Sequence, residues 1–271
     1  MYNKLQLSFK YLHYYLASAN GKGHGIHSPF VFEFITKVLN DKTKYPDYKQ
    51  VETLRQQLLK NETLLAIDDP GAGSSISKTN RPTVASIAKN AAKSKKFGQL
   101  LYRIVKYYQP ETILELGTSL GITTSYLATA NPKASVITIE GAKAVAAVAI
   151  ENFKTLKLQN VKLVEGNFDD TLLPVIGQEN PEQGRRTVNF AFIDGNHRRD
   201  PTERYFEQIL SKTNYDSILV FDDIHWSREM EQAWETIKSN EAVRCTIDLF
   251  FIGIVFFRQE FKEKQHFSIR F

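Results

Sequence analysis

The chain has 271 residues, 42% hydrophobic and 12% aromatic, which supplies a large apolar core and excludes a disordered protein. Its formal net charge is +5, and the basic residues are scattered, which argues against a nucleic-acid-binding stripe. The single cysteine, Cys245, excludes an internal disulfide and a multi-cysteine zinc site. Residues 1–10 lack a signal-peptide run, and the longest apolar run, 249–257, is too short to span a bilayer. We therefore expect a cytoplasmic protein without a membrane partner.

Residues 1–95 are predicted to be helical and to form a cap or lid region. The first helix carries apolar residues at helical spacing, namely Leu5, Phe9, Leu12 and Leu16. The second is predicted to begin with Ser28 as N-cap and Pro29 at the first helical position. The polar, glycine-bearing segment 68–75 is interpreted either as a plain loop or as a lid that folds over a ligand.

From residue 112 onward, strands and helices are predicted to alternate. Alternation of this kind implies a mostly parallel sheet with helices on both faces. Five strands are expected, at 112–116, 135–140, 161–165, 188–194 and 218–222. Asp200 and Ser227 are predicted to cap the helices that follow the last two of these strands. The final apolar runs, 243–250 and 252–257, are too close together for a crossover and should pair as an antiparallel hairpin.

Residues 112–121 join an apolar strand to a glycine-bearing turn and the next helix. This is the opening unit of a nucleotide-type α/β domain, in which glycine lets a ligand approach the backbone and the helix start offers unpaired N–H groups. A dinucleotide fingerprint beginning at Gly117 would need glycines at 119 and 122, where the chain has Ser119 and Ile122. The pattern that is present is Glu-x-Gly-x-x-x-Gly.

Acidic side chains stand at the predicted carboxyl ends of most strands. Open α/β sheets bind ligands at these ends, and clustered carboxylates repel one another unless a cation or polar ligand lies among them. The residues concerned are Glu115, Glu140, Glu165, Asp194, Asp222 and Asp223. Glu140 occupies the position where nucleotide-binding folds place an acid for ribose hydroxyls. The last three carboxylates end two strands that should be neighbours, and they suit Mg²⁺ or another hard cation.

The Glu-x-Gly-x-x-x-Gly pattern resembles motif I of the class I S-adenosylmethionine (SAM) methyltransferases. Together with the acids after the fourth and fifth strands, it is similar to the cation-dependent O-methyltransferases of the catechol and macrocin type, over roughly residues 97–258. The resemblance implies an α/β fold with a Rossmann-like, doubly wound, mostly parallel sheet of seven strands that ends in an antiparallel hairpin. It implies two regions, an N-terminal helical cap over 1–95 and a SAM-binding domain over 96–271.

The resemblance also implies the residues of a cofactor site and a metal site. SAM would be held by Glu115, Gly117, Thr118, Ser119, Gly121, Glu140, Gly141, Asn167, Phe168 and Asp194. A divalent cation, Mg²⁺ or another, would be held by Asp194, Asp222 and Asp223. The candidate catalytic residues are Asp194, His197 and His225, and either histidine could be the general base for a substrate hydroxyl. The alternative is that His197 contacts the cofactor and His225 hydrogen-bonds a loop.

The predicted function is transfer of a methyl group from SAM to a hydroxyl of a small molecule, with the cation as Lewis acid and template. The alternatives are a metal-independent N- or other methyltransferase and a non-catalytic SAM-binding protein. An Asn/Asp-Pro-Pro-Tyr/Phe motif is absent after the fourth strand, where the chain reads Asp194-Gly-Asn-His197, and this argues against amino-group methylation of nucleic-acid bases. We expect a hydroxylated small-molecule acceptor and no nucleic-acid partner. The N-terminal cap would shape the acceptor pocket or form a homodimer contact.

Overall fold

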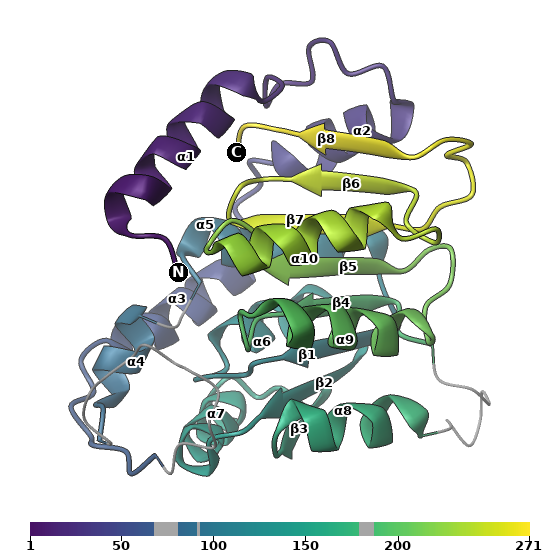
Figure 1. Ribbon diagram of the computed structural model, residues 1–271. Coiled ribbons are helices and arrows are strands. Elements are labelled where there is room, and N and C mark those ends of the chain that lie inside the picture. Colours follow the sequence, from purple (N-terminus) through teal and green to yellow (C-terminus); the bar gives the residue numbers. More distant parts are fainter. Residues whose placement is uncertain (68–80, 91–92, 179–186) are drawn as a thin grey trace. The chain divides into compact units, whose positions relative to one another are not determined.

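The computed structural model describes residues 1–67, 81–90, 93–178 and 187–271 (Figure 1). The chain divides into two compact units: unit 1 consists of Met1–Asp41 and Ile176–Phe271, and unit 2 of Lys42–Val175. This division does not follow the predicted boundary after residue 95: residues 1–41 group with the C-terminal strands, whereas the later N-terminal helices group with the segment that contains the first three strands. The predicted lid over 68–75 lies outside the described residues.

Unit 2 contains three parallel strands in the order β3-β2-β1. Their bounds are β1 Thr112–Leu116, β2 Ser135–Glu140 and β3 Val161–Glu165. In this register Glu115 pairs with Thr138, and Glu140 pairs with Glu165. Nearly every residue of β1 and β2 is buried, as expected for parallel strands covered on both faces.

The helices of this part of the chain are α3 Pro46–Leu58, α4 Val84–Asn90, α5 Lys95–Tyr108, α6 Ile122–Ala130, α7 Lys143–Thr155 and α8 Phe168–Gly177. Helices α5 and α6 approach closely because Gly98 has no side chain: a Cβ there would lie 2.6 Å from the ring of Tyr126. The Tyr126 hydroxyl donates to Glu52 on α3 at 2.6 Å. This contact joins α3 to α6 directly.

Unit 1 contains five strands in the order β4-β5-β7-β6-β8. Their bounds are β4 Phe190–Ile193, β5 Ile218–Asp222, β6 Cys245–Asp248, β7 Ile252–Phe256 and β8 Gln265–Ser268. Strands β4 and β5 are parallel, and β6 and β7 form the predicted antiparallel hairpin. Strand β8, which pairs in parallel with β6, was not predicted, because its short alternating sequence contains no apolar run. The described part of the chain therefore has eight strands rather than the predicted seven.

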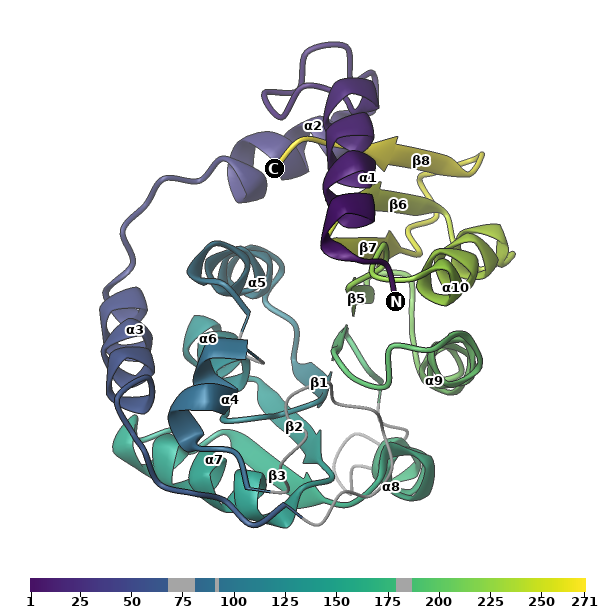
Figure 2. The same cartoon turned by 60° about the vertical axis from the view of Figure 1, so that its left-hand side comes forward.

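The helices of unit 1 are α1 Lys4–Ala17, α2 Pro29–Phe34, the π-helix η1 Ile35–Leu39, α9 Arg199–Leu210 and α10 Arg228–Ser239. Trp234 of α10 lies against Gly253 of β7, and Phe206 of α9 contacts Phe221 of β5. Phe30 and Phe34 pack on Phe256 of β7. Since side chains alternate along a strand, α2 covers the face of β7 opposite to α10 (Figure 2).

The structure confirms two of the three helix N-caps that were predicted from the sequence. Ser28 accepts a hydrogen bond from Val31 N, and Ser227 accepts one from Met230 N. The predicted cap at Asp200 is wrong, because α9 begins at Arg199, so that Asp200 lies in the first turn. An acid still favours the helix there, since it faces the positive end of the helix dipole.

Candidate functional site

The glycine-bearing turn lies in unit 2, between β1 and α6. Gly117 and Gly121 have φ values of 100° and 77°, in the left-handed region that favours glycine. The N–H groups of Gly117 and Thr118 donate to the carbonyl of Ile139 on β2, at 3.0 and 3.2 Å. A Cβ on Gly121 would lie 2.5 Å from the ring of Phe153. Glycine is therefore required at 121 by both backbone conformation and packing.

Glu140 lies at the end of β2, directly against this turn. One of its carboxylate oxygens accepts from the Ser119 N–H at 2.8 Å, and the other accepts from the Ala142 N–H at 2.9 Å. The side chain is half-buried. The structure thus brings together the two sequence features, the motif turn and the acid after the second strand, that were predicted to hold the cofactor.

Glu115 is fully buried within β1. Its Oε2 accepts from the Thr124 hydroxyl at 2.5 Å and from the Thr138 hydroxyl at 2.6 Å, and Thr138 also contacts the Thr118 hydroxyl at 2.6 Å. A buried carboxylate needs such partners to offset its lost hydration. Glu115 therefore ties β1, β2, α6 and the turn together. Its predicted contact with SAM stays a prediction.

The remaining predicted cofactor residues of unit 2 follow the ends of β2 and β3. Gly141 is half-buried and comes directly after Glu140. Asn167 is exposed at the start of α8, where its Oδ1 accepts from the Asp169 N–H at 3.1 Å. Phe168 is half-buried in the first position of that helix. These positions fit the predicted strand-end location, and their binding roles stay predictions.

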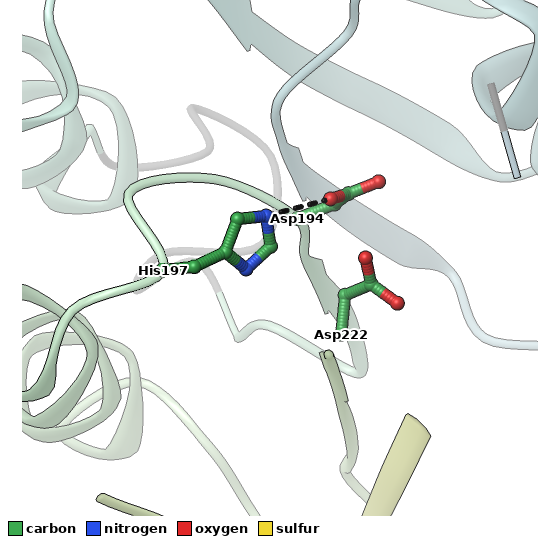
Figure 3. Close-up of side chains that lie close together, drawn as sticks. All are labelled: Asp194, His197 and Asp222. Carbon is green, nitrogen blue, oxygen red and sulfur yellow. Dashed lines mark ion pairs between the residues drawn. The ribbon is translucent and has the colours of Figure 1, made fainter. Parts of the chain in front are cut away.

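A cluster of potential metal ligands lies in unit 1 (Figure 3). Asp194, His197 and Asp222 each offer one ligand atom, and these atoms lie within 4.8 Å of one another. Asp194 directly follows β4 and Asp222 ends β5, and the carboxyl ends of these parallel neighbours meet at one edge. His197 reaches the cluster from the segment between β4 and α9, with its Nε2 3.5 Å from Asp194 Oδ1.

The cluster differs from the predicted metal site by one residue. In the described part of the chain it contains His197 but not Asp223, which follows Asp222 with φ 52° and donates its N–H to the Phe251 carbonyl at 2.7 Å. Consecutive residues at a strand end point in different directions, so two neighbouring acids do not converge easily on one point. Two carboxylates and an imidazole suit a divalent cation, whose charge would offset the repulsion between the acids.

His225, the other candidate base, has carboxylates at both ring nitrogens. Its Nδ1 is 3.2 Å from Glu231 and its Nε2 is 2.7 Å from Asp248, while the ring stacks on Phe250. Burial alone would lower the pKa of His225, but the hydrogen bonds and charges of Asp248 and Glu231 outweigh it, so the pKa is raised. This geometry favours the loop-holding alternative, because both nitrogens already have partners.

Sequence reasoning missed the residues around His225. Glu231 also accepts from the Tyr2 hydroxyl at 2.7 Å and forms an ion pair with Lys10 at 2.9 Å. Burial alone would raise the pKa of Glu231, but its hydrogen bonds from Lys10, Tyr2 and His225 lower it below its usual value. Tyr2 and Glu231 are 229 positions apart, so no local spacing could have indicated this contact.

Comparison with protein families identifies residues 114–224 as a match to a family described as a methyltransferase domain. This segment runs from β1, through the motif turn and Glu140, to the residues just after β5, and it includes the Asp194–His197–Asp222 cluster. No curated protein matches the sequence.

Three similar solved structures are methyltransferases. The O-methyltransferase TomG from Streptomyces achromogenes, in complex with SAM, is 17% identical, with a TM-score of 0.55 over 80% of this chain and 91% of its own. The Podospora anserina methyltransferase PaMTH1, with S-adenosylhomocysteine (SAH) bound, is 13% identical, with a TM-score of 0.58 over 96% and 98%. An O-methyltransferase from Bacillus cereus in complex with SAH is 18% identical, with a TM-score of 0.55 over 84% and 97%.

These similarities confirm the predicted Rossmann-like α/β fold and the resemblance to the class I methyltransferases, with O-methyltransferases among the similar structures. The matched domain and the fold together support a SAM-dependent methyltransferase. Among the described residues, no helix is both long enough and apolar enough to cross a membrane.

Proposed function

We propose that this protein transfers the methyl group of SAM to a hydroxyl group of a small molecule and uses a divalent cation to do so. The observation that carries the proposal is the convergence of Asp194, His197 and Asp222 at the ends of β4 and β5, inside the segment that matches a methyltransferase domain. The basic residues are scattered along the sequence and form no stripe, which favours a small-molecule acceptor over a nucleic acid.

The proposed cofactor residues belong to the turn of unit 2 and its supporting acids. The backbone of the turn, from Gly117 to Gly121, approaches SAM closely because neither glycine carries a side chain. Glu140 binds the ribose hydroxyls through the carboxylate that accepts from Ser119 N–H. Glu115 supports the turn indirectly, because its carboxylate accepts hydrogen bonds from Thr124 and Thr138 and so holds these side chains in place. SAM in TomG and SAH in two other similar structures support this choice of cofactor.

The proposed chemistry is attack of an acceptor oxygen on the methyl carbon of SAM: the O–CH3 bond forms as the S–CH3 bond breaks, SAH leaves, and the hydroxyl proton passes to a base. A divalent cation held by Asp194 and Asp222 would supply Lewis acidity toward that oxygen. A cation held by these carboxylates would also hold the acceptor oxygen in a fixed position, which lowers the entropic cost of reaching the reactive geometry. His197 either completes the ligand set or takes the hydroxyl proton, since a neutral imidazole nitrogen can do both.

The test is transfer of labelled methyl from SAM to a panel of hydroxylated small molecules, with Mg²⁺ or Mn²⁺ and with EDTA. We expect Asp194→Asn to reduce transfer by a factor of about 100 or more, as removal of an electrostatic catalytic group does. The matched control is Asp216→Asn in the same unit, an exposed acid paired with Arg258, which should leave transfer unchanged.

Metal binding measured by calorimetry separates the two roles of His197. Loss of both metal affinity and transfer in His197→Gln assigns it as a ligand, whereas loss of transfer alone assigns it as the base. Transfer that survives both EDTA and Asp194→Asn would contradict the metal-assisted mechanism and support the metal-independent alternative.

A further inference from the structure

The turn that follows β5 leads directly out of the Asp194–His197–Asp222 cluster. Asp222 is buried, and its backbone pairs with Ile252 at the start of β7. The next residue, Asp223, has φ 52°, a left-handed conformation that residues other than glycine keep only where their surroundings compensate for the strain. Its carbonyl accepts from the N–H of Trp226 at 2.9 Å, which closes the turn that contains His225.

A first hydrogen bond joins this turn to the connection between β6 and β7. The N–H of Asp223 donates to the carbonyl of Phe251 at 2.7 Å. The peptide group that carries this N–H also carries the carbonyl of Asp222, so the bond fixes the backbone on the C-terminal side of the proposed ligand. Phe251 lies between β6, which ends at Asp248, and β7, which begins at Ile252.

His225 makes a second link between the same two segments. Its Nε2 lies 2.7 Å from Oδ2 of Asp248, while Oδ1 of Asp248 accepts from the N–H of Phe250 at 2.7 Å. The ring of His225 also stacks on Phe250, with centroids 5.1 Å apart. One carboxylate therefore holds both the imidazole of the turn after β5 and the backbone of the connection after β6.

The other ring nitrogen of His225 adds less to this arrangement. Nδ1 lies 3.2 Å from Oε1 of Glu231, a longer contact than the one to Asp248. Glu231 also pairs with Lys10 at 2.9 Å and accepts from the hydroxyl of Tyr2 at 2.7 Å, so its carboxylate keeps partners when the imidazole is removed. Nε2 is therefore the nitrogen through which His225 holds the turn.

We propose that His225 is a positioning residue for the metal site: by binding Asp248 through Nε2, it holds the turn after Asp222 and so directs the Asp222 carboxylate toward the cation. Groups that orient a metal ligand without touching the metal commonly change its affinity by a factor of about 10–100 when they are removed. This inference rests on the proposed divalent cation. It gives His225 a role in metal affinity in place of the role of general base.

Two substitutions of His225 separate its two contacts. The side-chain amide of glutamine places a nitrogen near the position of Nε2, whereas the shorter asparagine places one near Nδ1. We expect His225→Gln to bind Mn²⁺ as tightly as the wild type, and His225→Asn to bind it about 10-fold or more weakly. Titration with Mn²⁺, followed by the electron paramagnetic resonance signal of the free ion, measures the affinity without turnover.

A second variant removes the same link from its other end. Asp248→Ala should weaken Mn²⁺ binding to the same extent as His225→Asn. In the metal-free protein, amide hydrogen exchange over 223–226 should be faster in His225→Asn than in His225→Gln, because only the asparagine variant has lost the link. Urea unfolding without metal verifies that each variant folds.

The matched control is His266→Asn on β8, which β7 and β6 separate from β5. His266 also has a side-chain hydrogen bond, with its Nδ1 2.8 Å from the hydroxyl of Thr246, but it does not contact the turn. The control should bind Mn²⁺ as the wild type does.

Equal Mn²⁺ affinity in the wild type, His225→Gln and His225→Asn would overturn the inference and leave the metal site in place. Loss of methyl transfer in both variants at unchanged Mn²⁺ affinity would overturn it in favour of His225 as the base. Equal weakening in both variants would also overturn it, because the link to Asp248 would then not be the cause. A wild type that binds no Mn²⁺ would contradict the proposed metal site itself, and this inference with it.

Discussion

At the scale of single residues, Gly121 is a position where few substitutions can be tolerated. Its φ of 77° strains any other residue, and a Cβ would also overlap the ring of Phe153. We predict that Gly121→Ala destabilises the protein by about 2–4 kcal/mol, the sum of backbone strain and overpacking. Gly25→Ala is the control, because Gly25 has φ 80° but nothing within 4 Å of its Cβ position. It should cost only about 1 kcal/mol in urea unfolding, and equal losses in the two variants would contradict the overlap.

Glu231 should make the stability of the fold depend on pH. Its pKa is lowered in the folded protein from the ordinary value of 4.5, so its stabilising contribution is complete above pH 4.5 and is lost as the pH falls through the lower folded value. We predict that Glu231→Gln is about 1–2 kcal/mol less stable than the wild type at pH 7, and that this difference shrinks below pH 4.5.

Unfolding by urea at several pH values measures this difference. Glu235→Gln on the same helix is the control, because Glu235 is exposed and forms a surface ion pair with Lys238. Surface pairs contribute little, so this variant should lose about 0.5 kcal/mol or less. A Glu231→Gln deficit that grows toward acid pH would have the wrong sign for a carboxylate stabilised in its charged form.

The sequence indicated two members of the Asp194–His197–Asp222 cluster but not the third. Asp194 and Asp222 were found because strand ends can be located from apolar runs, and acids at those ends are conspicuous. His197 in place of Asp223 could not be derived, because it depends on how the chain turns after each strand. The partners of His225 were hidden for a different reason, since Glu231 and Asp248 come from separate elements.

At the scale of secondary-structure elements, α10 depends on its cap. Ser227 is buried and accepts from Met230 N–H at 3.2 Å. We predict that Ser227→Ala costs about 1 kcal/mol in thermal or urea unfolding. Ser94 is the matched control, because it occupies the N-cap of α5 but its side chain makes no cap hydrogen bond among the described residues. A loss in Ser94→Ala as large as that in Ser227→Ala would show that hydrogen bonding is not the cause.

Elements were predicted well where burial and turn signals agreed. Strands β1, β2 and β5 have the predicted bounds because their mostly buried, mainly apolar runs are bordered by polar turns. Strand β8 was missed because edge strands need no apolar run. The stripe of α1 correctly indicated a helix, but periodicity does not say which way an apolar face points. That direction is set by Tyr2, Lys10 and Tyr14, which bind distant residues.

At the scale of the whole molecule, ligand binding should raise the melting temperature stepwise. SAM at about 100 times its Kd contributes about 2.7 kcal/mol by mass action, which for a protein of this size is roughly 5–10 °C. We predict that Mn²⁺ or Mg²⁺ adds a further increase that EDTA reverses. Asp194→Asn should lose most of the metal increment, and Gly121→Ala should lose most of the SAM increment. A metal increment unchanged in Asp194→Asn would place the cation elsewhere.

Phe250 connects parts of unit 1 that are far apart along the chain. It holds a left-handed backbone conformation, with φ 68°, and its ring contacts Tyr11, Tyr14 and His225. A residue other than glycine persists in such a conformation only when its surroundings compensate for the strain. We therefore expect the first helix and the turn that carries His225 to open together, so that amide hydrogen exchange in the two segments has the same opening free energy.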